Sequence, residues 1–411
     1  MRLARDAEST ECPAFRARRD QRAESSALPM VLSHGEGLNL FDVDGNRYVD
    51  LAAGFGAAIF GHGPTPIHAR ASEQIGSLVQ GLGDMLPTAI KIELSTRLAA
   101  IHPDPHAKVL LGQSGADAVT AALKTACLAT DRPGVLAFEG AYHGLSYAPL
   151  AACGFQSSLR LPFHAQLNPH VNFAPYPSSK EDLSNALSIA ASRLERGDIG
   201  AVLIEPVLGR GGVLVPPTGF LRSLFELARK HGALVIADEI WTGMGRAGAV
   251  SQTLAEDLVP DLLCFGKGLG ASFPISACIG TEPAMDAWAR SGQVVHTSTH
   301  AGAPLGCAAA LAVLDALEDG TVFNHVRSVS ARFFARAKDL GLTARGKGFM
   351  LGLDVPPSHA GPALFRSLIN RGYLTTLGGS AASVIVLTPP LTTSFGALES
   401  LLEVFRELVD R

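Results

Sequence analysis

The most reactive candidate in this sequence is a lysine that stands between two glycines. Lys267 lies in Gly266-Lys267-Gly268 and follows the apolar run 262–265, which indicates a buried strand. A lysine amine in apolar, partly desolvated surroundings has a lowered pKa and becomes a usable nucleophile. The tripeptide alone is a weak signal, because Gly346-Lys347-Gly348 repeats it in a stretch that we interpret as a turn.

Two other stretches place polar residues after apolar runs. Asp238 and Glu239 come directly after the run 233–237. A carboxylate at the mouth of a buried sheet is costly unless a cation or a hydrogen-bond donor faces it, and a buried ion pair is one interpretation. The stretch 112–117, which contains Ser114 and Gly115, opens a predicted helix at 118–127. Backbone N–H groups at a helix N-terminus can hold a phosphate, although many helices simply begin with serine.

Together the three stretches supply what pyridoxal phosphate requires from a protein. Lys267 offers the amine for a Schiff base, Asp238 the acid for the pyridine nitrogen, and 112–117 the phosphate site. The acid matters because a protonated ring nitrogen draws electrons from the substrate, and such a hydrogen bond contributes about 1.5–3 kcal/mol. A nucleotide site is not favoured, since no P-loop motif occurs and 208–212 lacks a full dinucleotide fingerprint.

Alternating strands and helices are predicted to position these residues. The pattern is clearest at 201–239, where a strand at 201–204 precedes a helix with apolar positions between 220 and 228. Thr218 is the expected cap of this helix, Gly232 its end, and 233–237 the next strand. This order predicts an α/β fold with a mainly parallel sheet covered by helices on both faces. Ligands bind such sheets at the carboxyl ends of the strands.

The flanking regions indicate a second, smaller α+β domain. Residues 42–46 are a predicted hairpin turn; they lack the remaining ligand positions of a calcium loop, and no metal site is predicted. Helices are expected at 308–317, 329–340 and 397–408. We predict an N-terminal segment, 1–58, that joins the small domain, a large cofactor-binding domain, 59–305, and a small C-terminal domain, 306–411. The basic residues Arg16, Arg18, Arg19 and Arg22 suggest a segment that packs on a partner subunit rather than a nucleic-acid arm.

Composition excludes several other classes of protein. The formal charge of −4 does not favour nucleic acid or an anionic membrane as a partner, and 47% hydrophobic residues permit a large core. No apolar stretch has the length of a membrane span, and the N-terminus has no apolar leader. Six scattered cysteines without a CxxC pair indicate reduced thiols, so a cytoplasmic location is expected.

From about residue 35 to residue 391 the sequence resembles the class III (subgroup II) pyridoxal-phosphate aminotransferases. This family includes the ornithine, acetylornithine and 4-aminobutyrate aminotransferases. The resemblance rests on an ordered series of motifs: Leu40-Phe41-Asp42-Val43-Asp44-Gly45-Asn46, Gly61-His62, Ser114-Gly115-Ala116-Asp117-Ala118-Val119, Ala141-Tyr142-His143-Gly144, Glu205-Pro206-Val207, Ala237-Asp238-Glu239-Ile240-Trp241-Thr242-Gly243-Met244-Gly245-Arg246, Pro260-Asp261-Leu262, Gly266-Lys267-Gly268, Thr299, Gly302 and Pro304.

The resemblance implies a fold of type I, like that of aspartate aminotransferase, and a homodimer with a shared active site. Lys267 would form the Schiff base and move the proton, and Asp238 would bind the ring nitrogen. The remaining cofactor-binding positions are then Ser114, Gly115 and Ala116 at the phosphate, Tyr142 and Ile240 on the two ring faces, and Thr299 from the neighbouring subunit. His143 and Glu205 also match cofactor-binding positions of the family. For these two, packing or indirect hydrogen bonding is as good an interpretation as a role in the chemistry.

Departures from the family pattern fall on the substrate side. Many 2-oxoglutarate-using members have arginine where Leu145 and Val386 stand here, and a glutamate where Arg210 stands. Trp241 replaces a glutamine that touches the cofactor. We therefore predict a rewired pocket walled by Phe55 and Trp241. In one interpretation Arg210 supplies the positive charge of this pocket. The alternatives are that the substrate has no carboxylate near the reacting carbon, or that Arg210 is a solvated loop residue.

The predicted reaction is ping-pong transamination between an amine or amino-acid donor and a keto or aldehyde acceptor. The alternative on the same scaffold is an amino-acid racemase or epimerase, which also needs proton removal and return through Lys267. A non-catalytic binding protein is the alternative from another class, and the presence of both Lys267 and Asp238 argues against it. The resemblance leaves open the donor, the acceptor, the stereochemistry and the choice between dimer and tetramer.

Overall fold

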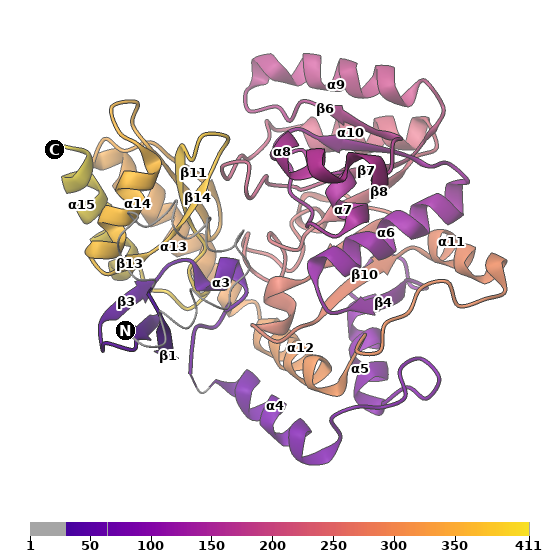
Figure 1. Ribbon diagram of the computed structural model, residues 1–411, viewed down its shortest axis with the longest axis horizontal. Coiled ribbons are helices and arrows are strands. Elements are labelled where there is room, and N and C mark those ends of the chain that lie inside the picture. Colours follow the sequence, from indigo (N-terminus) through magenta and orange to yellow (C-terminus); the bar gives the residue numbers. More distant parts are fainter. Residues whose placement is uncertain (1–29, 64, 411) are drawn as a thin grey trace.

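A seven-stranded mixed sheet forms the centre of the larger lobe in the computed structural model, which describes residues 30–63 and 65–410 (Figure 1). Its spatial order is β4-β10-β9-β8-β7-β5-β6, and only β10 runs antiparallel to its neighbours. The predicted α/β fold with a mainly parallel sheet is therefore confirmed. The strands are β4 (Lys108–Gly112), β5 (Gly134–Phe138), β6 (Val171–Ala174), β7 (Ile199–Ile204), β8 (Leu234–Asp238), β9 (Leu262–Phe265) and β10 (Ser276–Gly280).

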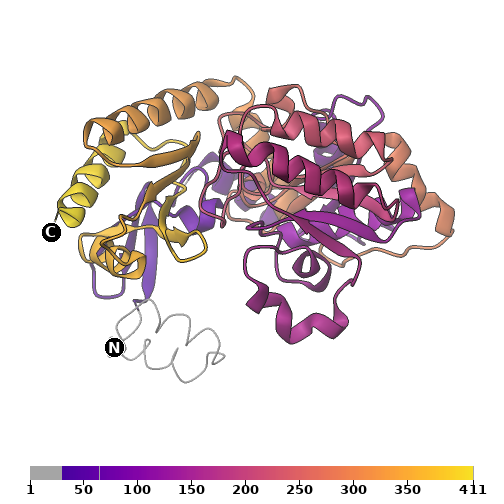
Figure 2. The ribbon, with the colours of Figure 1, turned by 90° about the horizontal axis from the view of Figure 1, so that it is seen from above.

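Alternate residues of the central strands face opposite layers of helices. On one face Leu136 and Val202 pack in a cluster with helices α9 (Lys180–Leu194) and α10 (Phe220–Lys230). On the other face Ala137 and Leu203 pack with helix α6 (Gly115–Thr130). Both faces of the sheet are apolar because both are covered, as expected for parallel strands joined by helices. Figure 2 shows these helices on either side of the sheet.

Helix α10 has the predicted apolar face but a different start. Gly219, not Thr218, is the N-cap residue, and no side chain caps this helix. The prediction of Thr218 as the cap was wrong because Gly219 has a φ of 93°, a conformation that glycine adopts without strain and that delays the first helical residue to Phe220. The helix ends at Lys230, two residues before Gly232, whose φ is also positive.

The smaller lobe contains two four-stranded sheets. In the first, β1 (Leu32–Glu36), β2 (Asn39–Asp42) and β3 (Arg47–Asp50) are joined by β13 (Tyr373–Leu374), which pairs in parallel with β3. The described part of the N-terminal segment therefore pairs with the C-terminal part of the chain. The second sheet consists of β11 (Ala344–Lys347), β12 (Met350–Asp354), β15 (Val384–Leu387) and β14 (Thr376–Gly378), all antiparallel.

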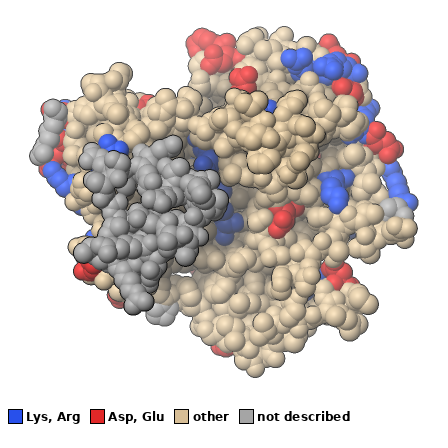
Figure 3. All heavy atoms as spheres, in the orientation of Figure 1, with Lys and Arg blue, Asp and Glu red and all other residues tan. Residues whose placement is uncertain are grey.

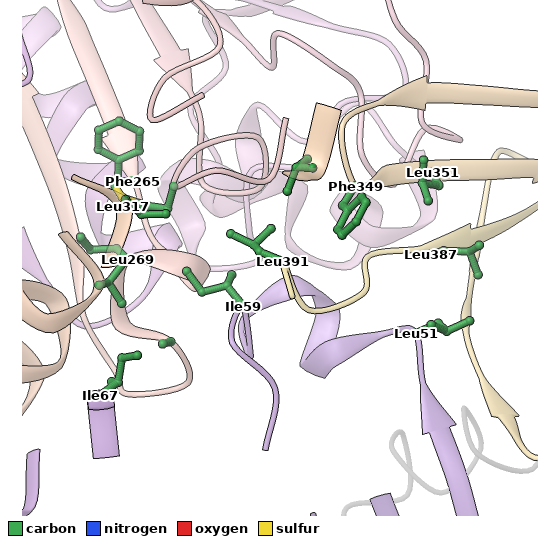
Figure 4. Close-up of a cluster of buried hydrophobic side chains, with 14 of the residues drawn as sticks. Leu51, Ile59, Ile67, Phe265, Leu269, Leu317, Phe349, Leu351, Leu387 and Leu391 are labelled. Atoms are coloured by element: carbon green, nitrogen blue, oxygen red, sulfur yellow. The ribbon is translucent and has the colours of Figure 1, made fainter. Parts of the chain in front are cut away.

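One continuous apolar cluster joins the two lobes (Figure 4). It contains Leu51 from the N-terminal segment, Ile59 just after that segment, Phe265 and Leu269 beside the predicted reactive lysine, and Leu387 from β15. All five side chains are fully buried. Because residues from distant parts of the sequence share this core, the loops around Lys267 are held from both lobes.

The remaining helices include several of a single turn and several of ten or more residues. Helix α12 packs on α4 and α5, and α13 packs on α15. The bounds are α3 (Ala53–Gly56), α4 (Pro66–Ser77), α5 (Ala89–Ala99), α7 (Tyr147–Ala151), α8 (Ser157–Arg160), η1 (Leu161–Gln166), η2 (Leu254–Glu256), η3 (Lys267–Gly270), α11 (Glu282–Met285), η4 (Asp286–Ser291), α12 (Pro304–Leu317), α13 (Thr321–Asp339), α14 (Gly361–Asn370) and α15 (Phe395–Val409).

Other predictions have mixed outcomes. The hairpin turn at 42–46 is confirmed between β2 and β3, and the three C-terminal helices exist with longer bounds than predicted. The basic residues Arg16 to Arg22 and Cys12 lie outside the described residues. Within those residues no helix has the length and apolarity needed to cross a membrane, and the five remaining cysteines are free thiols.

Candidate active site

The predicted site residues lie at one edge of the large sheet. Asp238 is the last residue of β8, and Lys267 follows the adjacent strand β9 by two residues. Ser114, Tyr142 and Glu205 follow β4, β5 and β7. Since β10 is the only reversed strand, all these positions are at carboxyl ends of strands that point the same way.

Lys267 sits in a strained and desolvated position. Its φ is +39°, which side chains other than glycine seldom adopt, and such outliers concentrate at functional sites. Both flanking glycines are buried, and a Cβ atom at Gly268 would lie 3.0 Å from Ile59 Cγ2. Burial lowers the pKa of the Lys267 amine from 10.5 to about 8, against the opposing effect of the negative charges of Asp238 and Glu205. The amine is therefore more nucleophilic than an ordinary lysine.

Asp238 and Glu239 have opposite surroundings although they are adjacent in sequence. Asp238 Oδ2 lies 2.6 Å from His143 Nδ1, and the acid is 4% exposed at the site edge of the sheet. The Glu239 carboxylate is directed instead toward the loop that follows it, and it accepts five hydrogen bonds, all from residues 242–253. Asp238 is thus the acid available to a ligand, and Glu239 holds a loop together.

Glu205 connects two loops of the site. Its carboxylate accepts the N–H of Tyr142 at 2.8 Å and the N–H of Gly209 at 3.0 Å. Burial raises the pKa of Glu205 to about 7; the nearby His143 opposes this rise and Asp238 adds to it. His143 and Glu205, both predicted near the cofactor, thus bind other groups of the chain: His143 the acid Asp238, and Glu205 the backbone.

The predicted phosphate end is a capped helix start. Ser114 caps α6, and Asp117 closes the capping box by accepting the N–H groups of Gln113 and Ser114. None of the hydrogen bonds formed among the described residues uses the N–H groups of Gly115 and Ala116. Two donors at a helix N-terminus are therefore available for an anion.

Ile240 lies between the phosphate end and the lysine. A Cβ atom at Gly115 would come within 2.7 Å of Ile240 Cδ1, and one at Gly266 within 3.3 Å of Ile240 Cγ2. Only glycine at position 115 lets the helix start approach this side chain so closely. Tyr142 lies on the loop after β5, and His143 next to it binds Asp238.

The three predicted pocket residues also come together. The Trp241 ring centroid is 4.4 Å from Lys267 Nζ. The indole fits against Gly56 and Gly209, where added Cβ atoms would lie 2.6 Å and 2.1 Å from it. Phe55 precedes the first of these glycines and Arg210 follows the second, and the Arg210 guanidinium carbon is 5.7 Å from the Phe55 ring centroid.

Thr299 belongs to a segment that lies beside the start of α6. It is exposed, and its carbonyl oxygen accepts a hydrogen bond from Gln80 Nε2 at 2.6 Å. The neighbouring Ser298 accepts a hydrogen bond from Gln113 Nε2 at 2.9 Å. The chain therefore brings this segment beside the helix start at Ser114, while the predicted contact of Thr299 with a neighbouring subunit stays a prediction.

Sequence reasoning missed Arg246 as a contributor to the site. This arginine is 1% exposed, donates to the carbonyl oxygens of Pro389 and Gly56, and contributes to the lowered pKa of Lys267. Burial lowers its own pKa to about 9. Its place in the motif around Asp238 could have indicated that Arg246 belongs to the site. Nothing in the sequence indicated that its side chain binds Gly56 and Pro389, which are 190 and 143 residues away.

The residues of this site have the groups that are needed to hold pyridoxal phosphate. Lys267 supplies an amine of lowered pKa, Asp238 a buried carboxylate oriented by His143, and α6 two N–H donors at its start. Within the described residues no cluster of possible metal ligands occurs. The sheet and the site together define a pyridoxal-phosphate-dependent enzyme of fold type I.

Comparisons with known proteins agree. Residues 21–409 match the family described as aminotransferase class-III. The acetylornithine aminotransferase of Methanopyrus kandleri is 34% identical, with 92% of this chain and 93% of the relative covered. The 5-aminovalerate aminotransferase of Pseudomonas aeruginosa is 34% identical, with 93% and 94% covered. The alanine/serine racemase of Pyrococcus horikoshii is 29% identical, with 93% and 86% covered.

Solved structures share the fold over almost the whole chain. An amine transaminase from an uncultivated Pseudomonas species, in its PLP-bound form, has a TM-score of 0.85 and 27% identity and covers 94% of this chain and 98% of its own. The chain belongs to the class III aminotransferase family, and its cofactor is pyridoxal 5'-phosphate.

Proposed function

We propose that this aminotransferase works by a ping-pong mechanism in which Lys267 holds the cofactor and moves the proton. The proposal rests on one observation above the others. A largely buried amine with a pKa lowered to about 8 stands beyond the end of β9, next to the strand that ends in the buried acid Asp238. Burial of an ionisable amine and an acid on neighbouring strands is costly, and such pairs are concentrated at functional sites.

Each residue then has a definite task. When bound, pyridoxal 5'-phosphate supplies an aldehyde that condenses with amines and a ring that withdraws electrons from the reacting carbon. Asp238 holds a proton on the ring nitrogen, and His143 orients Asp238. Lys267 Nζ accepts the proton that leaves the donor carbon, and its lowered pKa keeps more of the amine neutral than in an exposed lysine.

The phosphate and the ring need positioning residues. Ser114 fixes the start of α6, and the N–H groups of Gly115 and Ala116 bind the phosphate oxygens. Tyr142 and Ile240 would lie on the two faces of the pyridine ring. Glu205 holds the Tyr142 loop in place. Such fixed groups reduce the entropy that must be lost when the reacting atoms are brought together.

Incubation of the holoenzyme with an amino donor alone tests transamination. A transaminase transfers the amino group to the cofactor, so the absorbance of the Lys267-bound cofactor disappears in one turnover and returns when a keto or aldehyde acceptor is added. A racemase returns the proton to the same carbon, so this absorbance persists while the optical rotation of the donor falls. The second result would replace the proposed function by racemisation.

We further propose a homodimer that shares its active sites. Segment 75–92, which includes the end of α4 and the start of α5, exposes large apolar side chains at Ile75, Leu78, Val79, Leu82, Met85, Leu86 and Ile92. Figure 3 shows few charged side chains on this part of the molecule. Apolar patches of this kind mark interaction surfaces. Thr299 borders this patch, because its carbonyl oxygen accepts a hydrogen bond from Gln80, and we propose that it reaches the site of the copy that covers the patch.

Mixed dimers test the role of Thr299 across the interface. Thr299→Ala and Lys267→Ala chains are co-expressed with different tags, and the hybrid is isolated. If Thr299 serves the partner's site, one of the two sites in the hybrid has both residues, and the hybrid regains about half of the wild-type activity per dimer. If it serves its own chain, no site is complete, and the hybrid has no more than about half of the activity of the Thr299→Ala homodimer.

The free thiols support a location in the cytoplasm. Four of the five cysteines in the described part of the chain are buried, and none of the five forms a disulfide. Buried thiols act as small apolar groups and persist in a reducing compartment.

A further inference from the structure

We propose that Trp241 is a positioning residue for Lys267, and that the face of its indole ring holds the ammonium form of the amine whenever Lys267 is not attached to the cofactor. The proposal rests on the proposed function, because Lys267 must carry a proton during each half-reaction. It is supported by the contact between the ring and the amine, by the way in which the indole is fixed, and by the charges around the amine.

The amine lies over the face of the indole ring. Lys267 Nζ is 4.4 Å from the Trp241 ring centroid. The negative face of an aromatic ring attracts a cation at this distance, and indole attracts it more strongly than the rings of tyrosine and phenylalanine. The attraction increases when the cation is desolvated, and both glycines that flank Lys267 are buried. The contact therefore favours the ammonium form over the neutral amine.

Packing fixes the indole on two sides. A Cβ atom at Gly56 would lie 2.6 Å from Trp241 Nε1, and one at Gly209 would lie 2.1 Å from Cε3. The ring also packs against a buried apolar cluster that includes Val207 and Val386. Within the part of the chain that the structure describes, the buried Nε1 forms no hydrogen bond. Packing, and not a hydrogen bond, therefore sets the orientation of the ring face.

The loop that carries the ring and the strand that precedes the amine are packed together. Gly243, two residues after Trp241, donates its N–H to the carbonyl oxygen of Glu239 at 2.9 Å. A Cβ atom at Gly243 would lie 2.6 Å from Cδ1 of Phe265, which ends β9 two residues before Lys267. The ring and the amine are thus held near each other before a proton arrives, and little freedom is lost when the ammonium forms.

The charges around the amine leave a task for a neutral group. Four charged side chains act on it: Asp238, Glu205, Arg210 and Arg246. Burial lowers the pKa of the amine to about 8, the two acids oppose this and the two arginines add to it; His143 binds the first acid. A third carboxylate would form a salt bridge with the ammonium and hold the proton that Lys267 must pass on. A ring face attracts the cation without taking its proton.

Fluorinated tryptophan tests the contact without disturbing the packing. Fluorine withdraws charge from the ring face and changes the size of the indole little. The chain has two tryptophans, and the full-length protein is produced with tryptophan, monofluorotryptophan or trifluorotryptophan at both. Trp241→Phe protein with the same labels is the matched control, because the labels are then only at Trp288, whose ring centroid is 5.9 Å from Lys124 Nζ.

The first readout is the pH midpoint of the rate at which the cofactor-free protein takes up pyridoxal 5'-phosphate. We expect three fluorines at Trp241 to lower this midpoint by roughly 0.4 to 1.5 pH units, the range of cation–π contacts, and one fluorine to lower it less. The shift is downward because the ammonium form loses its attraction to the ring. In Trp241→Phe protein the midpoint is lower than in wild type and does not respond to the labels.

The second readout is the rate at which the cofactor absorbance of the holoenzyme disappears with donor alone. This rate should fall in the same order, by roughly two- to fivefold with three fluorines, because a weaker base takes the proton more slowly. A midpoint that ignores the fluorines at Trp241, or that responds equally in Trp241→Phe protein, would overturn the proposal. A shifted midpoint with an unchanged rate would overturn the role in proton transfer.

The same measurements separate this proposal from the proposed function. The donors are L-alanine, 4-aminobutyrate and 1-phenylethylamine. If one of them removes the cofactor absorbance of the wild type while the uptake midpoint ignores the fluorines, the proposal for Trp241 fails and the proposed function stands. If none of them changes the absorbance of the wild type, the proposed function itself fails.

Discussion

The tripeptide Gly-Lys-Gly occurs twice in this protein, and the two copies have opposite environments. Lys267 follows a buried strand, has a φ of +39° and a pKa of about 8, and contacts the Trp241 ring. Lys347 ends strand β11 just before a two-residue hairpin turn, its side chain is 37% exposed, and it pairs with Glu256 at 2.7 Å. The same three residue types thus form a reactive site in one place and a surface ion pair in the other.

The glycines serve different purposes in the two copies. At Gly346 a Cβ atom would lie 1.9 Å from the Met350 carbonyl oxygen, so glycine allows the two hairpin strands to approach. Around Lys267 the glycines admit the side chains of Ile240 and Ile59. What creates the chemistry is therefore the burial of the lysine beside an acid on a neighbouring strand, and not the motif itself.

The largest expected difference is in activity. Lys267→Ala should reduce kcat by at least about 10³-fold, because a positioned acid–base group alone contributes 10²- to 10⁴-fold and the attachment of the cofactor is lost as well. Lys347→Ala should leave kcat within about twofold, because its ammonium forms a partly exposed ion pair with Glu256. Steady-state kinetics with a saturating donor measures both. Comparable losses in the two variants would remove the distinction between the copies.

The adjacent acids extend the comparison to a second pair. Asp238→Asn should keep the fold and lower kcat by about 100-fold, since roughly 3 kcal/mol of charge-assisted hydrogen bonding is lost. Glu239→Gln should lower the free energy of unfolding by about 3 kcal/mol, because a buried carboxylate with five donors becomes an amide. Kinetics and denaturant unfolding separate the two effects, and a reversed assignment would contradict the account of the site.

The pH dependence of cofactor uptake reports the environment of Lys267 directly. Burial disfavours the ammonium form, so the neutral amine forms above about pH 8 and not above the ordinary 10.5. The rate at which the cofactor-free protein takes up pyridoxal 5'-phosphate should therefore rise through pH 8. Asp238→Asn removes a negative charge that raises this pKa and should move the midpoint lower. A stopped-flow midpoint near 10.5 in the wild type would show that the amine is not desolvated.

The smallest effect is expected at the ion pair of the other copy. Lys347→Met should change the free energy of unfolding by no more than about 1 kcal/mol, as is usual for exposed pairs. High salt should reduce even this difference, since it screens exposed charges. A loss of several kcal/mol would show that Lys347 has a structural role that its exposure does not suggest.

Much of the fold could be predicted because parallel strands and helices have distinct periodicities. The runs at 201–204, 233–237 and 262–265 became β7, β8 and β9, and the polar residues after them do meet at one edge. Strand alternation also explains why Asp238 and Glu239 face different ways. The predicted domain boundaries at 58 and 305 stay predictions.

Contacts between distant residues could not be predicted in the same way. Trp241 fits only because Gly56 and Gly209 leave room for the indole, and no local pattern links these three positions. Likewise, the cap at Gly219 depends on one backbone torsion, and the reach of Arg246 depends on how the lobes pack. The sequence motifs indicated which residues matter near Lys267, but their mutual geometry required the structure.

Borohydride reduction of the holoenzyme tests the central claim most directly. The reagent fixes the cofactor on the amine to which it is attached, and peptide mass analysis then identifies the lysine. The account predicts the added mass on the peptide that contains Lys267 and none on the peptide that contains Lys347. Cofactor mass on any other lysine, or none on Lys267, would contradict it.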